Sequence, residues 1–193
     1  DQKPILTKIR ASGADLVYMG GVIETGAQVV VRQMKEVGLV APRTRFMGPD
    51  GLLEEELLKG ATCDAALATD MRVTFAGLPF EKMRGVGAKT YETYKTKYGK
   101  EPTSYALYAA EGTRVIIEAI KKAAPAIEKA KDVTEKREAL RKAIAATKNY
   151  EGINGKWSFD ENGDVDYDTM SGFKAVKAEG PIGCKFQFET ILE

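Results

Sequence analysis

The chain has 193 residues, of which 44% are hydrophobic and 30% are charged, and this balance excludes a disordered chain. Its 29 basic and 28 acidic residues are well mixed and leave a net charge of +1, which excludes an electrostatic footprint for nucleic acid. The sequence contains no histidine, the commonest general base and zinc ligand, and no run of about 18 apolar residues that could span a bilayer.

The first part of the chain alternates between helical and strand-like patterns. A helix ending at residues 11–13 is followed by a strand over 14–21, "ADLVYMGG", and a second strand over 44–48, "TRFMG". Between the two strands, apolar residues recur at helical spacing: Ala27, Val30, Val31, Met34 and Val37. After the second strand, "LLEEELL" predicts a short helix, and "CDAALAT" at 63–69 predicts a third strand. This alternation favours βαβ units on a parallel sheet.

The pattern changes after residue 72. A long polar helix is predicted over 78–102, and a second helix begins near residue 104. The second helix has the strongest apolar stripe of the chain, which we expect to be core: Tyr105, Tyr108, Ala109, Gly112, Val115, Ile116, Ala119 and Ile120. A charged connection over 127–137 leads into another helix, "VTEKREALRKAIAAT".

The last fifty residues are strand-like. The segment "GKWSFDENGDVDY" alternates around Asn162-Gly163 and predicts a β-hairpin with its turn there. Two closing strands follow, "SGFKAVKAEG" and "CKFQFETIL". Asp160 and its neighbours resemble a calcium loop, but Val165 stands where such a loop needs glycine, so no metal site is predicted.

Two predicted strands end in glycine-rich loops. The first ends at Gly20-Gly21 and the second at "GPDG", residues 48–51. The glycine spacing at 20, 21 and 26 differs from GxGxxG, so a nucleotide fingerprint is poorly supported and no cofactor is predicted. In open α/β sheets, however, ligands bind outside the carboxyl ends of the strands. Two adjacent strand ends therefore predict one wall of a binding crevice.

Asp50 is the ionisable residue that comes directly off one of these strand ends. Aspartate is also favoured in turns and at helix N-caps, so a purely structural role stays open. In the functional interpretation, its carboxylate binds the ammonium group of a ligand. Tyr105, at the start of the strong helix beside Pro102 and Thr103, is a second candidate for ligand contact.

Several segments appear together in the order of a known family: "ASGADLVYMGG", "VRQMKEVGL", "FMGPDG", "YKTKYGKEPTSYALYAAEGTRVIIEAIKKA" and "WSFDENGDV". The chain resembles the substrate-binding component of a branched-chain amino-acid ABC transporter, a type I periplasmic binding protein. The resemblance implies a Venus-flytrap fold of two α/β lobes with parallel sheets, between which the ligand is trapped. It further implies that residues 1–72 and 173–193 belong to the second lobe and that 73–172 cross back to the first.

The resemblance also assigns roles to individual residues. Asp50 matches the acid of "GPEG"-type loops that takes the ligand's amino group. Val22, just after Gly21, falls where some members have a tyrosine that lines the pocket, and this departure leaves the side-chain specificity open. Tyr105 matches the aromatic position against the ligand's side chain. The family pattern begins before Asp1, so we expect the loop that holds the ligand's carboxylate to belong to an amino-terminal segment outside this chain.

The function implied is capture of an aliphatic amino acid, such as leucine, in the periplasm or outside the cell, and its delivery to a membrane permease. The alternative is a cytoplasmic small-molecule sensor of the same fold, similar to the amide sensors. An enzyme is disfavoured because no nucleophile motif, histidine or metal cluster is present. Cys63 and Cys184 could be two buried thiols or one disulfide, and the resemblance favours the disulfide because it places both in the second lobe.

Overall fold

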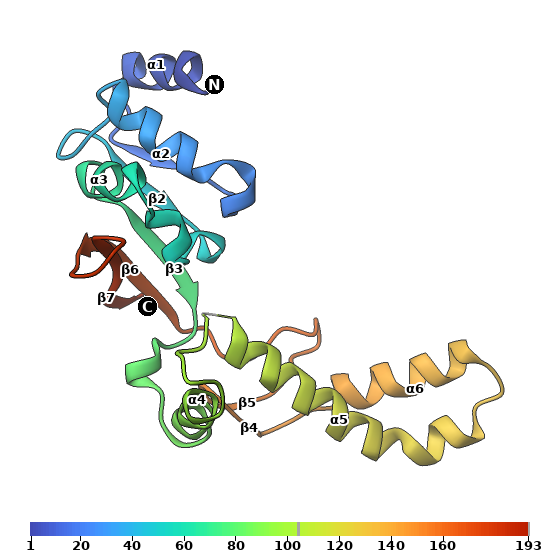
Figure 1. Ribbon diagram of the computed structural model, residues 1–193. Helices are drawn as coiled ribbons and strands as arrows, with labels where there is room; N and C mark the ends of the chain where they lie inside the picture. The colour runs from blue at the N-terminus through green and yellow to red at the C-terminus, as the bar shows by residue number, and fades with distance from the viewer. Residues whose placement is uncertain (104, 193) are drawn as a thin grey trace. The chain divides into compact units, whose positions relative to one another are not determined.

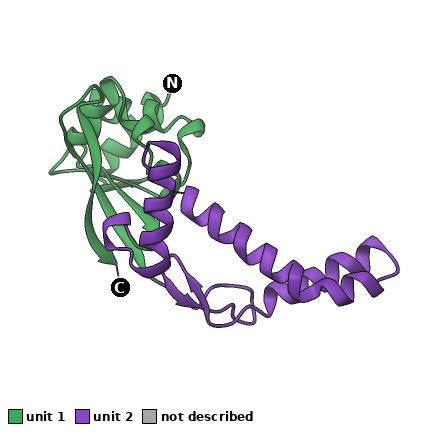
Figure 2. Cartoon of the chain, turned by 60° about the horizontal axis from the view of Figure 1, so that its bottom comes forward, with its two compact units in different colours: residues 1–78, 169–193 green, residues 79–168 purple. Residues whose placement is uncertain are grey.

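The chain forms two compact units in the computed structural model, which describes residues 1–103 and 105–192. Unit 1 consists of Asp1–Leu78 and Thr169–Glu193, and unit 2 consists of Pro79–Asp168 (Figure 2). Because unit 1 is built from two separate segments, the chain passes between the units twice.

A five-stranded mixed sheet forms the centre of unit 1 (Figure 1). Its strands, in spatial order, are β1 (Leu16–Tyr18), β2 (Arg45–Gly48), β3 (Arg72–Ala76), β6 (Met170–Lys177) and β7 (Cys184–Leu192). β1, β2 and β3 are parallel, whereas β6 pairs antiparallel with β3, and β7 pairs antiparallel with β6. The predicted parallel sheet is therefore present in the first three strands, and the two closing strands extend it with the opposite direction.

Three α-helices accompany this sheet: α1 (Lys3–Ser12), α2 (Ala27–Glu36) and α3 (Ala61–Ala68). Short 3₁₀ turns lie between them: η1 (Ile23–Thr25), η2 (Asp50–Leu52) and η3 (Glu55–Leu58). α2 buries Ala27, Val31 and Met34 at spacings of four and three, which is the face that its periodicity predicts. These side chains share the core of unit 1 with Phe46 on β2 and Val73 on β3, both fully buried.

The predicted strand over residues 63–69 is wrong, because residues 63–68 lie in α3 and Thr69 is its C-cap. A short apolar run cannot be assigned by periodicity alone, and the alanines and leucine of "CDAALAT" favour a helix. The third strand comes later, at "RVTFA" in β3, where β-branched and aromatic residues favour extended backbone.

Unit 2 consists mainly of helices. Its elements are η4 (Phe80–Lys82), α4 (Gly85–Tyr98), α5 (Ala106–Lys129), α6 (Val133–Ala145) and a two-stranded sheet of β4 (Tyr150–Gly152) and β5 (Gly155–Trp157). α5 and α6 pack against each other as an antiparallel pair (Figure 1). The predicted helix over 78–102 is shortened to α4 at both ends, where Pro79 precedes η4 and Gly99 caps α4 with positive φ. Along the described residues, no helix combines the length and hydrophobicity needed to cross a bilayer.

The hairpin predicted around Asn162-Gly163 is only partly correct. A tight turn is present, in which the Asp160 carboxylate accepts hydrogen bonds from the backbone N–H groups of Asn162 (2.8 Å) and Asp164 (2.9 Å). A single bridge, Phe159 to Val165, closes it. The ladder lies earlier, between β4 and β5, where the paired residues Tyr150 and Trp157 pack their rings 5.1 Å apart between centroids.

The apolar stripe of α5 is largely exposed, contrary to the prediction that it is core. Tyr105, Ile116 and Ile120 are 42%, 46% and 44% exposed. The buried face consists of every fourth residue: Leu107, Glu111, Val115, Ala119 and Ala123. α5 is apolar on more than one face, and periodicity alone does not show which face the neighbouring elements cover.

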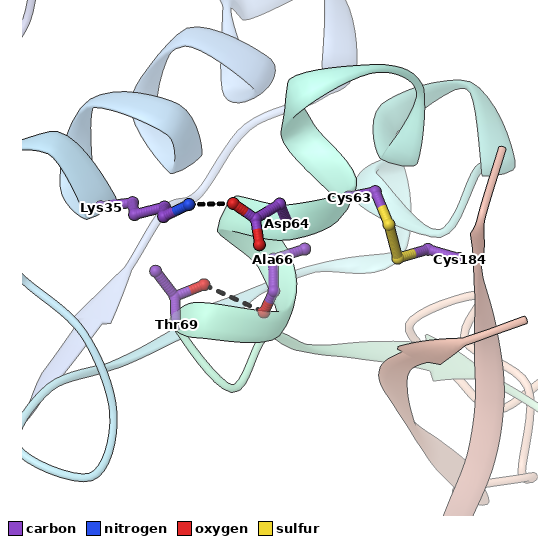
Figure 3. The surroundings of a disulfide bond; sticks show 6 residues. All are labelled: Lys35, Cys63, Asp64, Ala66, Thr69 and Cys184. Carbon is purple, nitrogen blue, oxygen red and sulfur yellow. Dashed lines mark hydrogen bonds and ion pairs between the residues drawn. A yellow bond between two sulfur atoms is a disulfide. The ribbon is translucent and has the colours of Figure 1, made fainter.

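A disulfide joins Cys63 on α3 to Cys184 on β7 (Figure 3), as the family resemblance predicts. Their Cα atoms are 5.6 Å apart although the residues are separated by 121 positions in the sequence. The bond therefore fastens the first segment of unit 1 to the second.

Candidate ligand-binding site

The carboxyl ends of β1 and β2 lie side by side in unit 1. The two strands are parallel, with Tyr18 opposite Met47, and the backbone N–H of Met19 donates to the carbonyl oxygen of Met47 at 3.0 Å. Both strands therefore end at the same edge of the sheet, as predicted. The loops that follow them, residues 19–22 and 49–51, form what we call the strand-end site.

The two loops of the strand-end site touch each other. A Cβ atom added at Gly51 would lie 2.6 Å from Cγ1 of Val22 and 3.1 Å from the carbonyl oxygen of Gly21. Three of the predicted site residues, Gly21, Val22 and Asp50, are thus brought together by the fold. Val22 is 42% exposed, so its side chain is accessible at this edge.

Asp50 is half-buried and is the first residue of η2, the 3₁₀ turn that follows β2. Pro49 occupies the N-cap of this turn, so Asp50 does not hold the position from which an aspartate caps a helix. The backbone N–H of Leu53 donates to the Asp50 carbonyl oxygen at 2.9 Å, which holds the main chain of the turn. A carboxylate is a suitable partner for a cationic group, and Asp50 brings one to the strand-end site.

A second carboxylate, Glu54, follows shortly after Asp50 and was not singled out from the sequence. It is half-buried, and burial raises its pKa, with further increases from the negative charges of Glu24 and Glu55. Glu24 lies in η1, after β1, so the turns that follow both strands carry acidic side chains. The signal in the sequence is the run of three acids in "LLEEELL" directly after the second strand end. This edge of unit 1 therefore has a negative potential that favours cationic groups.

Tyr105 belongs to unit 2, where it is the N-cap of α5 and is 42% exposed. Tyr108, one turn further on, is held inside unit 2: Asn154 Nδ2 donates to its hydroxyl oxygen at 2.9 Å, and burial raises its pKa to about 12. A neutral phenol in such a position has a packing role. Of the two tyrosines that begin α5, Tyr105 is the more accessible.

The described part of the chain holds no group of three or more His, Cys, Asp or Glu side chains arranged to bind a metal ion. The strand-end site itself offers the Asp50 carboxylate, backbone groups and apolar side chains, and Glu24 and Glu54 follow its two loops. Such a set suits reversible binding of a small molecule with a positive charge.

A parallel β1–β2–β3 sheet with loops at its carboxyl ends is the arrangement at which open α/β proteins bind their ligands. A model of the family described as "Periplasmic binding protein" matches residues 1–178. The chain therefore belongs to the periplasmic binding protein family, which confirms the family predicted from its sequence segments.

One curated relative and two solved structures illustrate the similarity, the relative in sequence and the structures in fold. An amino acid binding protein of Pseudomonas aeruginosa is 32% identical over 165 residues, which cover 86% of this chain and 39% of that protein. The leucine binding protein LivK of Thermotoga maritima has a TM-score of 0.76 at 23% identity, over 100% of this chain and 48% of its own. LivJ of Streptococcus pneumoniae, solved in complex with isoleucine, has a TM-score of 0.67 at 20% identity, over 98% of this chain and 49% of its own.

These structural likenesses confirm the predicted fold, that of type I periplasmic binding proteins. The chain spans about two fifths of the length of the curated relative and about half the length of the two solved proteins.

Proposed function

We propose that the whole protein is the extracytoplasmic solute-binding component of an ABC importer. It captures an aliphatic or branched-chain amino acid between two lobes and delivers it to a membrane permease, with no bond made or broken. In this proposal, residues 1–72 and 173–193 belong to the second lobe and 73–172 to the first. The amino-terminal part of the whole protein supplies the remainder of the site.

The observation that carries the proposal is the position of Asp50. Asp50 is half-buried and directly follows a strand end, and the next residue, Gly51, contacts the loop of Gly21 and Val22. An α-ammonium group is the cation that every amino acid carries. A charge-assisted hydrogen bond to such a group contributes about 1.5–3 kcal/mol. This is a substantial part of the roughly 8 kcal/mol that corresponds to micromolar affinity.

The remaining candidate residues bear on the ligand's side chain. Val22 is small and accessible, and Tyr105 offers an accessible aromatic surface. Both suit an aliphatic side chain, and the relatives named for leucine and crystallised with isoleucine bind ligands of this kind. An aromatic acid without an amino group has no ammonium group for Asp50 to bind.

The Cys63–Cys184 disulfide supports a location outside the cytoplasm, in the periplasm or at the cell exterior. Disulfides persist in oxidising compartments and are rare in the cytosol. The disulfide therefore disfavours the alternative function, a cytoplasmic sensor of the same fold.

The proposal is tested by titrating leucine into the whole protein and its Asp50→Asn variant by calorimetry. We expect the variant to bind leucine about tenfold more weakly, or worse, because the neutral amide loses the charge assistance. The matched control is Asp64→Asn in unit 1, which removes the same charge from a side chain that is 73% exposed. Unchanged leucine affinity in Asp50→Asn, or no binding of any aliphatic amino acid by the wild type, would refute the proposal.

A further inference from the structure

The contact between the two loops of the strand-end site depends on the absence of a side chain at residue 51. A Cβ atom there would lie 2.6 Å from Cγ1 of Val22, closer than real Cβ atoms come to other heavy atoms. It would also lie 3.1 Å from the carbonyl oxygen of Gly21, a tight contact with backbone. Gly51 therefore lets the loop after β2 rest directly on the Val22 side chain.

The neighbouring residues hold both partners of this contact in place. On the β2 side, the fully buried Leu52 side chain packs against Gly48, where an added Cβ atom would collide with it. On the β1 side, the Thr25 hydroxyl donates to the Val22 carbonyl oxygen at 2.7 Å and accepts from the Val22 N–H at 3.2 Å. The loop of residues 49–51 is thus fixed by Leu52 from within the core and by Val22 from the adjacent loop.

We propose that the contact between Gly51 and Val22 positions the Asp50 carboxylate for the ligand's ammonium group, so that both are positioning residues of the binding site. This inference rests on the proposed function, in which Asp50 binds that group. Asp50 is joined directly to Gly51, so a shift of residue 51 away from Val22 moves the carboxylate with it. Hydrogen bonds lose strength when the donor–acceptor distance leaves a narrow range. A displacement of the Asp50 carboxylate therefore weakens its hydrogen bond to the ligand's ammonium group.

The test is a double-mutant cycle in the whole protein, with leucine binding measured by calorimetry. Gly51→Ala in the wild-type background is expected to weaken leucine binding by about tenfold, because the new methyl group collides with Val22. In a Val22→Ala background, the colliding γ-methyl is absent and the contact with the Gly21 carbonyl oxygen remains, so Gly51→Ala is expected to cost clearly less, about threefold. Gly112→Ala, on α5 with open space around its added Cβ atom, controls for the extra methyl group and is expected to bind leucine as the wild type does.

A second ligand separates positioning of Asp50 from general damage to the site. 4-Methylpentanoate has the carbon skeleton of leucine without its amino group, so its binding does not use the pairing with Asp50. Gly51→Ala is therefore expected to weaken leucine binding more than 4-methylpentanoate binding. Circular dichroism and thermal unfolding establish that each variant is folded.

Three results would overturn the inference: unchanged leucine affinity in Gly51→Ala, an equal loss in both backgrounds of the cycle, or an equal loss for both ligands. If Asp50→Asn weakens leucine binding while Gly51→Ala does not, the positioning role alone fails. If Asp50→Asn has no effect, the proposed function fails, and the positioning role fails with it.

Discussion

Asp70 offers the sharpest test of what holds the sheet of unit 1 together. Its side chain is only 17% exposed and lies at the point where three strands present cationic groups. Lys174 Nζ lies 2.8 Å from one carboxylate oxygen, Arg45 Nε lies 3.0 Å from the other, and Arg72 also donates to the latter. The perturbation is Asp70→Asn, which keeps the shape of the side chain and removes its charge.

The expected loss of stability in Asp70→Asn depends on how exposed the three cationic partners of Asp70 are. Burial by itself would raise the pKa of Asp70, but hydrogen bonds from Lys174, Arg72 and Arg45 lower it well below its ordinary value of 3.8. A hydrogen bond to a charged group contributes about 1.5–3 kcal/mol when it is shielded from water. The three cationic side chains are 31–51% exposed, so solvent screens each of them. We therefore expect Asp70→Asn to lower the free energy of unfolding of unit 1 by about 2–3 kcal/mol at pH 7.

The pH dependence has a definite sign. The pKa of Asp70 is lower in the folded state than in the unfolded chain, so the folded state favours the charged form. The stabilisation is complete above the unfolded pKa of about 3.9 and is lost as the pH falls toward the folded value. The difference in stability between the wild type and Asp70→Asn should therefore be constant from pH 7 to about 5 and shrink below about pH 4.

The assay is urea unfolding, with hydrogen exchange of the backbone amides of β2 and β3 as the readout. These amides report on unit 1 directly. Trp157 fluorescence reports on unit 2 and is unsuitable here. Asp64→Asn, whose exposed carboxylate pairs with Lys35 (Figure 3), is the matched control and should change stability by less than about 1 kcal/mol. An Asp70→Asn variant as stable as the wild type at pH 7, or a difference that persists undiminished at pH 3, would refute the reasoning.

Two further predictions concern stability. Replacing both Cys63 and Cys184 by serine should lower the free energy of unfolding by as much as about 5 kcal/mol, because the bond closes a loop between residues 121 positions apart. Equal urea midpoints for the oxidised wild type and the variant would contradict this. Glu111 is 9% exposed and accepts hydrogen bonds from Trp157 Nε1 at 3.1 Å and from the backbone N–H of Ile153. Because Glu111→Ala leaves both buried donors without this acceptor, it should destabilise unit 2 by about 3 kcal/mol. The fluorescence emission of Trp157 should shift to longer wavelength in this variant. An unchanged emission spectrum and urea midpoint would show that Glu111 does not stabilise unit 2 in this way.

Much of unit 1 could be predicted from the sequence, because most of its hydrophobic patterns fit only one type of secondary structure. The buried face of α2 follows from helical spacing, and the strands over 14–21 and 44–48 contain β1 and β2. Residues 63–69 could not be assigned, because a short apolar run fits a buried strand and a buried helix equally well. On α5, the sequence identifies apolar positions, but the covered face is determined by tertiary contacts.

In the candidate site, too, some features could be predicted from the sequence and others could not. Asp50 and Gly21 could be placed at strand ends because parallel neighbours finish at one edge of a sheet. The close approach of Gly51 to Val22 could not, since it depends on distances between two loops that are nearly thirty residues apart in sequence. The desolvation of Glu54 likewise depends on packing that a run of acids does not reveal.

The covalent link between α3 and β7 has a topological consequence. Unit 2 lies wholly within the ring that the sulfur–sulfur bond closes, because that ring runs from Cys63 to Cys184 and unit 2 from Pro79 to Asp168. A single peptide-bond cleavage anywhere in unit 2 would open the ring and still leave both resulting pieces joined as one molecule. The strands contributed by the two ends of the chain would then stay tethered to each other without an intact main chain between them.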